Sequence, residues 1–255
     1  KAIGRSIIDY ACPVWTPMVS RSYMESLQSA QNSALRIITG NLRMASVDHL
    51  HTETKMLLVG THCGMLAEQF LVNSLVETHP NHDTIERNTP PRLMKHTLQS
   101  KFGENMLGHL PPDFMGTITP GQAKYAIRTV HTTTVDTEIV NTGPNRVLNA
   151  RPPDIDASEQ RLGRRTRTLL TQLRSGHSTL LRQYKFRIGI DDSDECPECR
   201  QSPHGTEHLF NCICRPTNLT TSSLWTNPVG AAEFLGLPGA GSTKDAAALY
   251  PQGVG

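Results

Sequence analysis

The chain has 255 residues, of which 37% are hydrophobic and 5% aromatic, and its formal net charge is +2. These fractions are low for one large globule, so we expect part of the chain to lie outside any core. The sequence has no run of about 18 apolar residues and no signal-peptide pattern at its start. We therefore expect an intracellular protein without a membrane partner, and the first residue, Lys1 rather than Met, fits a fragment of a longer polypeptide.

Four helices are predicted for the N-terminal third, residues 1–79. Apolar spacing indicates a short helix over 6–15 that prolines end, a helix from Ser20 to a left-handed cap at Gly40, a short helix over 46–51, and a longer one over 55–77. Gly60 and Gly64 mark either close helix contact or a break in the last of these. One side of the second helix is polar, for which solvent is the default environment; its residues are Gln28, Gln31, Asn32 and Arg36.

Residues 80–155 have the composition of a partly ordered linker. Nine of the seventeen prolines lie between residues 79 and 153, and periodic apolar faces are confined to short pieces. The stretch 125–140 is rich in β-branched residues, which predicts one or two short strands. His131, Asp136 and Glu138 alternate there, but polar residues on one strand face usually meet water, so we expect no catalytic set.

A basic helical hairpin is predicted next, within a C-terminal region spanning 156–238. Asp156 and Glu159 form a capping-box pattern, an apolar stripe follows up to Gly176, and a second helix is expected over 178–189. Between Arg161 and Arg187 lie eight basic residues and no acidic one: Arg161, Arg164, Arg165, Arg167, Arg174, Arg182, Lys185 and Arg187. Without i,i+4 counter-charges, the run favours phosphate contact over a solvated face. His177 and Tyr184 could add stacking, although core packing explains Tyr184 equally well.

The cysteine pattern after this hairpin predicts a metal site. Four of the six cysteines lie between residues 196 and 214, and Cys196-x-x-Cys199 is followed by His208-x-x-x-Cys212. Two thiolates from a tight turn and two ligands one helical turn apart can close a tetrahedron around one Zn²⁺. Such a closed Cys₃His shell leaves no position for an activated water, so the zinc would be structural. His204 could replace His208 and Cys214 could replace Cys212.

Other chemistry is less favoured by the sequence. The acids just before Cys196 are typical of a solvated turn and have no partner motif for a two-metal site. No βαβ pattern surrounds Cys196 and Cys199, which argues against a redox pair. Two short helices are expected over 219–235, and residues 239–255 are predicted to be disordered. The fold class is therefore mainly α: a helical bundle, a long linker, and a basic hairpin with a small zinc knuckle.

Several stretches resemble the C-terminal region of LINE-type non-LTR retrotransposon reverse transcriptases. They are residues 5–15 (RSIIDYACPVW), 27–40 (LQSAQNSALRIITG), 172–178 (QLRSGHS) running through 187–189 into the knuckle, and 207–210 (EHLF). Together they cover about half of the chain. The resemblance implies a thumb-like first domain, a knuckle that binds RNA or target DNA during target-primed reverse transcription, an upstream polymerase domain in the same polyprotein, and a nuclear location.

The chain departs from this family's polymerase at one decisive motif. This motif consists of an aromatic residue, any residue and then two aspartates. It is absent here, because Asp191 and Asp192 follow Gly189 and Ile190. We expect no catalytic residues and no polymerase activity in this chain alone, although the parent protein would be an RNA-directed DNA polymerase. The predicted function is nucleic-acid binding as part of a transposable element; the alternative is a free-standing structural-zinc module that binds protein.

Overall fold

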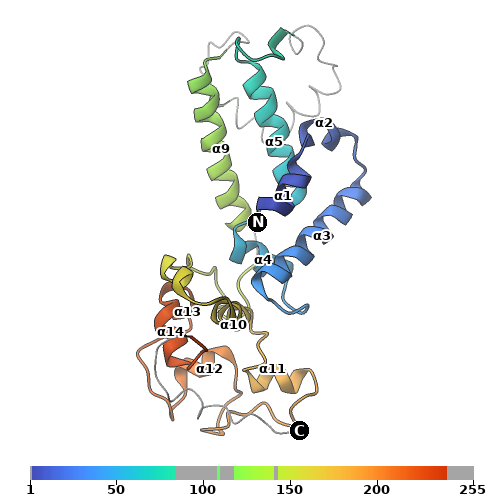
Figure 1. The fold of residues 1–255 in the computed structure, drawn as a ribbon. Coiled ribbons are helices and arrows are strands. Elements are labelled where there is room, and N and C mark those ends of the chain that lie inside the picture. Colours follow the sequence, from blue (N-terminus) through green and yellow to red (C-terminus); the bar gives the residue numbers. More distant parts are fainter. Residues whose placement is uncertain (1, 84–107, 110–117, 141–142, 240–255) are drawn as a thin grey trace. The chain divides into compact units, whose positions relative to one another are not determined.

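The computed structural model is mainly helical, as the sequence predicts (Figure 1). It describes residues 2–83, 108–109, 118–140 and 143–239, and within these ranges there are isolated β-bridges but no strands. The chain forms two compact units. Unit 1 comprises residues 1–34 and 55–141, and unit 2 comprises 35–54 and 142–255. Residues 35–54, which belong to the predicted N-terminal domain, are thus part of the second unit.

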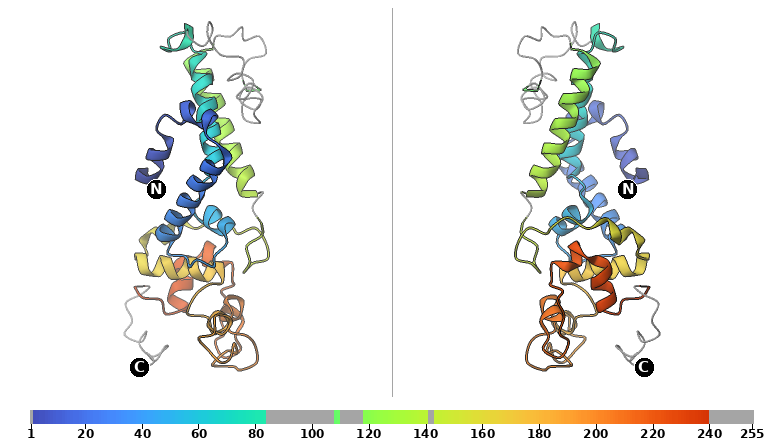
Figure 2. Two further views of the ribbon diagram at one scale, coloured as in Figure 1. Left: turned by 90° about the vertical axis from the view of Figure 1, so that its right-hand side faces the viewer. Right: turned by 90° about the vertical axis from the view of Figure 1, so that its left-hand side faces the viewer.

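Unit 1 is built on two long helices, α5 (Val59–Ser74) and α9 (Pro120–Val140), which lie side by side in Figures 1 and 2. A core of buried apolar side chains joins them, including Met65, Val72, Ala126 and Val130. The predicted helix over 55–77 is confirmed with a later start, because Leu58 has an extended backbone. Gly60 lies inside α5, where the position of its missing Cβ is 3.8 Å from Met24 Cγ, so it marks helix contact and not a break.

The first helical segment of unit 1 differs from the prediction. It divides into α1 (Ala2–Asp9) and α2 (Cys12–Trp15), followed by the 3-10 turn η1 (Thr16–Met18). Ala11 has φ of +51° and separates the helices, and proline lies in the first turn of α2, where its missing N–H is harmless. Proline therefore starts a helix here, whereas the sequence predicted that it ends one.

The second predicted helix is confirmed as α3 (Arg21–Thr39), but its polar side does not face only solvent. Gln28 Oε1 accepts a hydrogen bond of 2.8 Å from the Val59 N–H, which satisfies a donor in the first turn of α5. Gln31 is buried and donates to the Leu57 carbonyl oxygen at 3.0 Å. These amides fix α3 to the start of α5.

The strands predicted within 125–140 are wrong, because this stretch belongs to helix α9. Threonine hydroxyls along α9 donate to carbonyl oxygens one turn earlier, as Thr133 does to Thr129 at 2.9 Å. Ala123, Ala126 and Val130 recur at helical spacing and are buried against α5. Tertiary packing on this stripe outweighs the β propensity of the branched residues. Residues 84–107, 110–117 and 141–142 of the predicted linker, and the predicted disordered tail beyond Gly239, lie outside the described residues.

Unit 2 begins at the end of α3, where Gly40 has φ of +71° and confirms the predicted left-handed cap. Helix α4 (Val47–Thr54) follows, and the Ser46 hydroxyl accepts from the His49 N–H at 3.2 Å to cap it. After the 3-10 turn η2 (Ala157–Arg161), an extended Leu162 interrupts the chain before α10 (Arg164–Ser175). The predicted single helix from Asp156 to Gly176 is thus a turn followed by a helix.

The core of unit 2 is one cluster that includes the helix of the cysteine-rich segment. Helices α10, α12 (Thr206–Asn211), α13 (Ser223–Thr226) and α14 (Pro228–Phe234) contribute Leu170, Leu173, Phe210, Trp225 and Ala231. The two helices predicted over 219–235 are confirmed as α13 and α14. No helix in the described part of the chain is both long and apolar enough to span a bilayer.

Candidate metal centre

A tight turn positions the first two cysteines. The Cys196 N–H donates to the Ser202 carbonyl oxygen at 2.9 Å, and the Arg200 N–H donates to the Cys196 carbonyl oxygen at 3.0 Å. Arg200 adopts a left-handed conformation with φ of +53°, which turns the chain back on itself. These backbone hydrogen bonds fold Cys196 and Cys199 toward one point.

Helix α12 supplies the other two ligands. His208 lies in the helix and Cys212 is its C-cap residue, so the predicted one-turn spacing is confirmed. The start of α12 is anchored by the buried Thr206, whose hydroxyl donates to the Leu173 carbonyl oxygen at 3.0 Å. Leu209 and Phe210 are buried in the unit 2 core. They attach α12 to α10 and α13.

The four ligand atoms converge on a common centre. The Cys196 and Cys212 sulfurs are 3.9 Å apart, Cys199 Sγ is 3.3 Å from His208 Nε2, and all four atoms lie within 4.8 Å of one another. Zn–S bonds of about 2.3 Å and a Zn–N bond of about 2.0 Å at tetrahedral angles imply separations of about 3.8 Å and about 3.5 Å. This donor set could therefore hold a metal ion, and its spacing is compatible with zinc.

The two alternative ligands have other roles. His204 is buried, and its Nδ1 accepts a hydrogen bond of 3.1 Å from the Arg182 N–H. Burial, with the neighbouring His208, lowers the pKa of His204 to about 4, so the ring stays neutral and can accept this bond. Cys214 is exposed and lies outside the cluster of four. His204 thus links the knuckle to helix α11 (Arg182–Arg187).

The thiols differ in their electrostatic environment. Burial raises the pKa of Cys212 to about 11, whereas hydrogen bonding from the Gln201 backbone lowers the pKa of Cys199. A metal ion has to displace the Cys212 proton, because the thiolate is the ligand. Metal binding at this centre should therefore release protons.

Comparison with protein-family models, curated proteins and solved structures found no match.

Four predicted phosphate-binding arginines are exposed. Arg161 lies at the end of η2, and Arg164, Arg165 and Arg167 lie in the first turn of α10. Arg164 donates to the Ile37 carbonyl oxygen at 3.1 Å, and none of the four forms an ion pair among the described residues. Lys185 is half-buried, and the exposed Arg187 has its guanidinium 5.3 Å from the Tyr184 ring centre. Tyr184 itself is buried, so the core-packing alternative describes it.

Arg174 and His177 do not fit the predicted role, because both are buried. Arg174 is fully buried and pairs with Glu53 of α4 at 2.5 Å and with Glu159 of η2. Glu159 thus neutralises Arg174, and Asp156 caps η2 by accepting from the Ser158 N–H. The structure leaves Arg174 no free donor face for a phosphate.

Arg182 is also neutralised. It forms a bidentate ion pair with Asp191, with N–O distances of 3.1 and 3.2 Å, and this pair lowers the pKa of the Asp191 carboxyl. One of the acidic residues before the knuckle, Asp191, is therefore the ion-pair partner of Arg182. The absence of local counter-charges in the sequence was misleading, since acids from α4, η2 and the 191–195 loop supply them in space.

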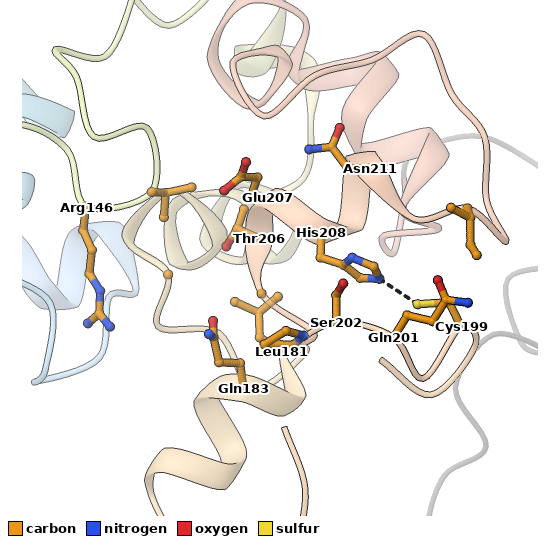
Figure 3. Close-up of a pocket in the computed structure, with 15 residues that line it drawn as sticks. Arg146, Leu181, Gln183, Cys199, Gln201, Ser202, Thr206, Glu207, His208 and Asn211 are labelled. Atoms are coloured by element: carbon orange, nitrogen blue, oxygen red, sulfur yellow. Dashed lines mark hydrogen bonds between the residues drawn. The ribbon is translucent and has the colours of Figure 1, made fainter. Parts of the chain in front are cut away.

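Sequence reasoning missed Arg146, which lies in the predicted linker. Arg146 Nη1 is 3.2 Å from His177 Nε2, and the His177 and Tyr184 rings meet edge to face at 5.7 Å. Arg146 also lines a cavity of about 500 Å³ beside the metal ligands (Figure 3). No local motif marks this arginine, because its position depends on the chain returning past the end of α10.

Proposed function

We propose that unit 2 is a nucleic-acid-binding module whose knuckle is held by structural zinc. The observation that carries this proposal is the group of exposed arginines around the start of α10, Arg161, Arg164, Arg165 and Arg167, which form no ion pair among the described residues. Four guanidinium groups within seven residues form a surface suited to phosphate, because each can give two parallel hydrogen bonds to its oxygens.

Zinc is the ion that the donor set favours. Thiolates select soft or borderline metals, and Cys₃His at tetrahedral separations is a structural-zinc arrangement. The role of the ion would be to join the 196–202 turn to α12 and so to hold the knuckle against α11. The chain's own residues bind nucleic acid in this proposal, and we assign no catalytic step to it.

The resemblance to LINE-type reverse transcriptases extends the proposal. It implies that the module works beside a polymerase domain of the same polyprotein, in the nucleus, where it would contact RNA or target DNA during target-primed reverse transcription. Unit 1, with α3 and α5, would correspond to the thumb-like region that grips a template-primer duplex.

The test is the salt dependence of binding. Fluorescence anisotropy with labelled RNA and DNA should show affinity falling steeply between low and moderate salt. Loss of two phosphate contacts in Arg164→Ala/Arg165→Ala should lower the slope of log K against log salt by about 1.4 for single strands and about 1.8 for duplexes. The matched control is Arg43→Ala/Arg151→Ala, which removes two other exposed charges from unit 2. An unchanged slope in the first variant would refute the phosphate role of these arginines.

A second function is favoured by a separate observation. Four large apolar side chains near the knuckle are exposed by 40–68%: Phe186, Ile188, Ile190 and Ile213. Such a surface suits a zinc module that binds protein. Salt separates the two functions, since an apolar protein contact should persist where phosphate binding is lost.

A further inference from the structure

The cavity beside the metal ligands has the size and lining of a site for one flat polar ligand. Its volume of about 500 Å³ is within the range of small-molecule sites. Three amide side chains line it, from Gln183, Gln201 and Asn211, and none of these amides has a hydrogen-bond partner among the described residues. Val147 and the exposed Ile213 add apolar surface. An amide offers both donors and an acceptor, which matches the edge of a nucleobase.

One of these amides lies close to the backbone of Gly205. A Cβ on Gly205 would lie 2.6 Å from Gln183 Oε1, so the absence of a side chain at Gly205 lets the amide lie against the backbone. Figure 3 shows Gln183 with Arg146 on one side of the cavity and His208 with Cys199 on the other. The metal ligands therefore form one wall, and the start of α11 forms another.

Two arginines at this side of unit 2 have no counter-ion. Arg146 contacts His177, His177 contacts Tyr184, and Arg187 lies over the Tyr184 ring. Neither arginine forms an ion pair within the described residues. Burial and the neighbouring charge of Arg187 lower the pKa of Arg146. Two cations that repel each other without an acid nearby are stabilised by an anion.

We propose that this cavity accepts one unpaired nucleobase of a single-stranded nucleic acid, with an adjoining phosphate on Arg146 and Arg187. The inference rests on the proposed function and specifies its substrate, because a base that is paired in a duplex cannot present its edge inside a concave site. The amides contact the edge of the base, the apolar side chains contact its face, and the arginines contact the backbone. Arg146 and Arg187 are then a second phosphate contact, separate from the arginines of α10.

The experiment compares two labelled strands of twelve nucleotides in anisotropy titrations of the full zinc-loaded chain. One strand carries bases, and the other carries abasic tetrahydrofuran units with the same phosphates. The intact strand should bind about fivefold more tightly or better, the discrimination expected of amide contacts to a base edge. Gln183→Ala/Asn211→Ala should abolish this difference, and Gly205→Ala, which displaces the Gln183 amide, should reduce it. Gln160→Ala is the matched control for an exposed glutamine.

The arginine variants should change the affinity in a different way. Arg146→Ala/Arg187→Ala should weaken both strands by a similar factor, while Arg151→Ala, which removes another exposed arginine, should change neither. The proposal is overturned if the intact and abasic strands bind equally, or if the amide variant keeps the difference. In those outcomes salt-dependent binding through α10 still stands. Binding of neither strand overturns both this inference and the proposed function, provided that metal content and helicity are unchanged.

Discussion

Replacing Arg174 by methionine should destabilise unit 2 strongly. The guanidinium is fully buried and uses three nitrogens: Nε and Nη2 donate to the Leu224 carbonyl oxygen at 3.0 and 2.6 Å, and Nη1 and Nη2 pair with Glu53 and Glu159. Arg174→Met leaves two largely buried carboxylates and one carbonyl without their donor. Removal of one partner from such a network costs about 3–5 kcal/mol. This is a large part of the 5–15 kcal/mol that usually stabilises a domain.

Urea unfolding followed by tryptophan fluorescence measures this loss. Trp225 is buried with its ring centre 5.7 Å from the Arg174 guanidinium, and a Trp15→Phe background makes it the only tryptophan. Arg165→Met, on the exposed side of the same helix, is the control and should change the free energy of unfolding by less than about 0.5 kcal/mol. Adding Glu53→Gln and Glu159→Gln should restore part of the stability lost in Arg174→Met.

The same pair of variants decides between the sequence-based and the structure-based role of Arg174. If Arg174→Met unfolded at the urea concentration of the parent protein and lost nucleic-acid affinity as Arg165→Met does, Arg174 would be a surface phosphate contact. The reasoning from burial would then be refuted.

Three further predictions concern titration and backbone geometry. His177 is buried, and burial with nearby arginines lowers its pKa from 6.5 to about 4, so the unfolded state binds the proton first as pH falls. The free energy of unfolding should therefore drop by about 3 kcal/mol between pH 6.5 and 4. In His177→Gln the urea midpoint should change less with pH over this range. Gly40→Ala should destabilise the protein by about 1–2 kcal/mol, because φ is +71° and Thr168 fills the space that the new methyl group would need. Gly64→Ala, in open space on a helix, should instead stabilise the protein by about 0.5–1 kcal/mol. Equal shifts of the thermal midpoint in the two variants would contradict this prediction. Arg200→Gly should relieve the positive φ of +53° and raise the thermal midpoint of the zinc-loaded chain, and a lower midpoint would count against the turn geometry.

Sequence patterns predicted those elements whose signals are local. The helix up to Gly40, the short helix after Ser46 and the paired helices before Gly236 each combine apolar spacing with a cap or a stop residue. The strands predicted within 125–140 were wrong because β propensity depends on context, and the alanine and valine stripe on α9 finds a partner in α5. That partner is about 60 residues away in sequence, so no local window contains it.

The candidate site also has a part that the sequence predicts and a part that it does not. The metal ligands were predictable because Cys-x-x-Cys and His-x-x-x-Cys are local spacings, and the structure brings these four side chains together. The basic surface was only partly predictable, because Glu53 neutralises Arg174 from another part of the chain and Asp191 neutralises Arg182. Arg146 carries no sequence signal, since its role follows from the packing of residues 143–150 near the end of α10.

The most direct test of the account is the metal content of the purified chain. Inductively coupled plasma mass spectrometry should find one zinc per chain, and Cys199→Ser should lose it. Cys214→Ser, which changes an exposed cysteine outside the cluster, should keep it. Zinc in equal amounts in both variants, or none in the parent chain after expression and purification with zinc, would contradict the assignment of Cys196, Cys199, His208 and Cys212 as its ligands.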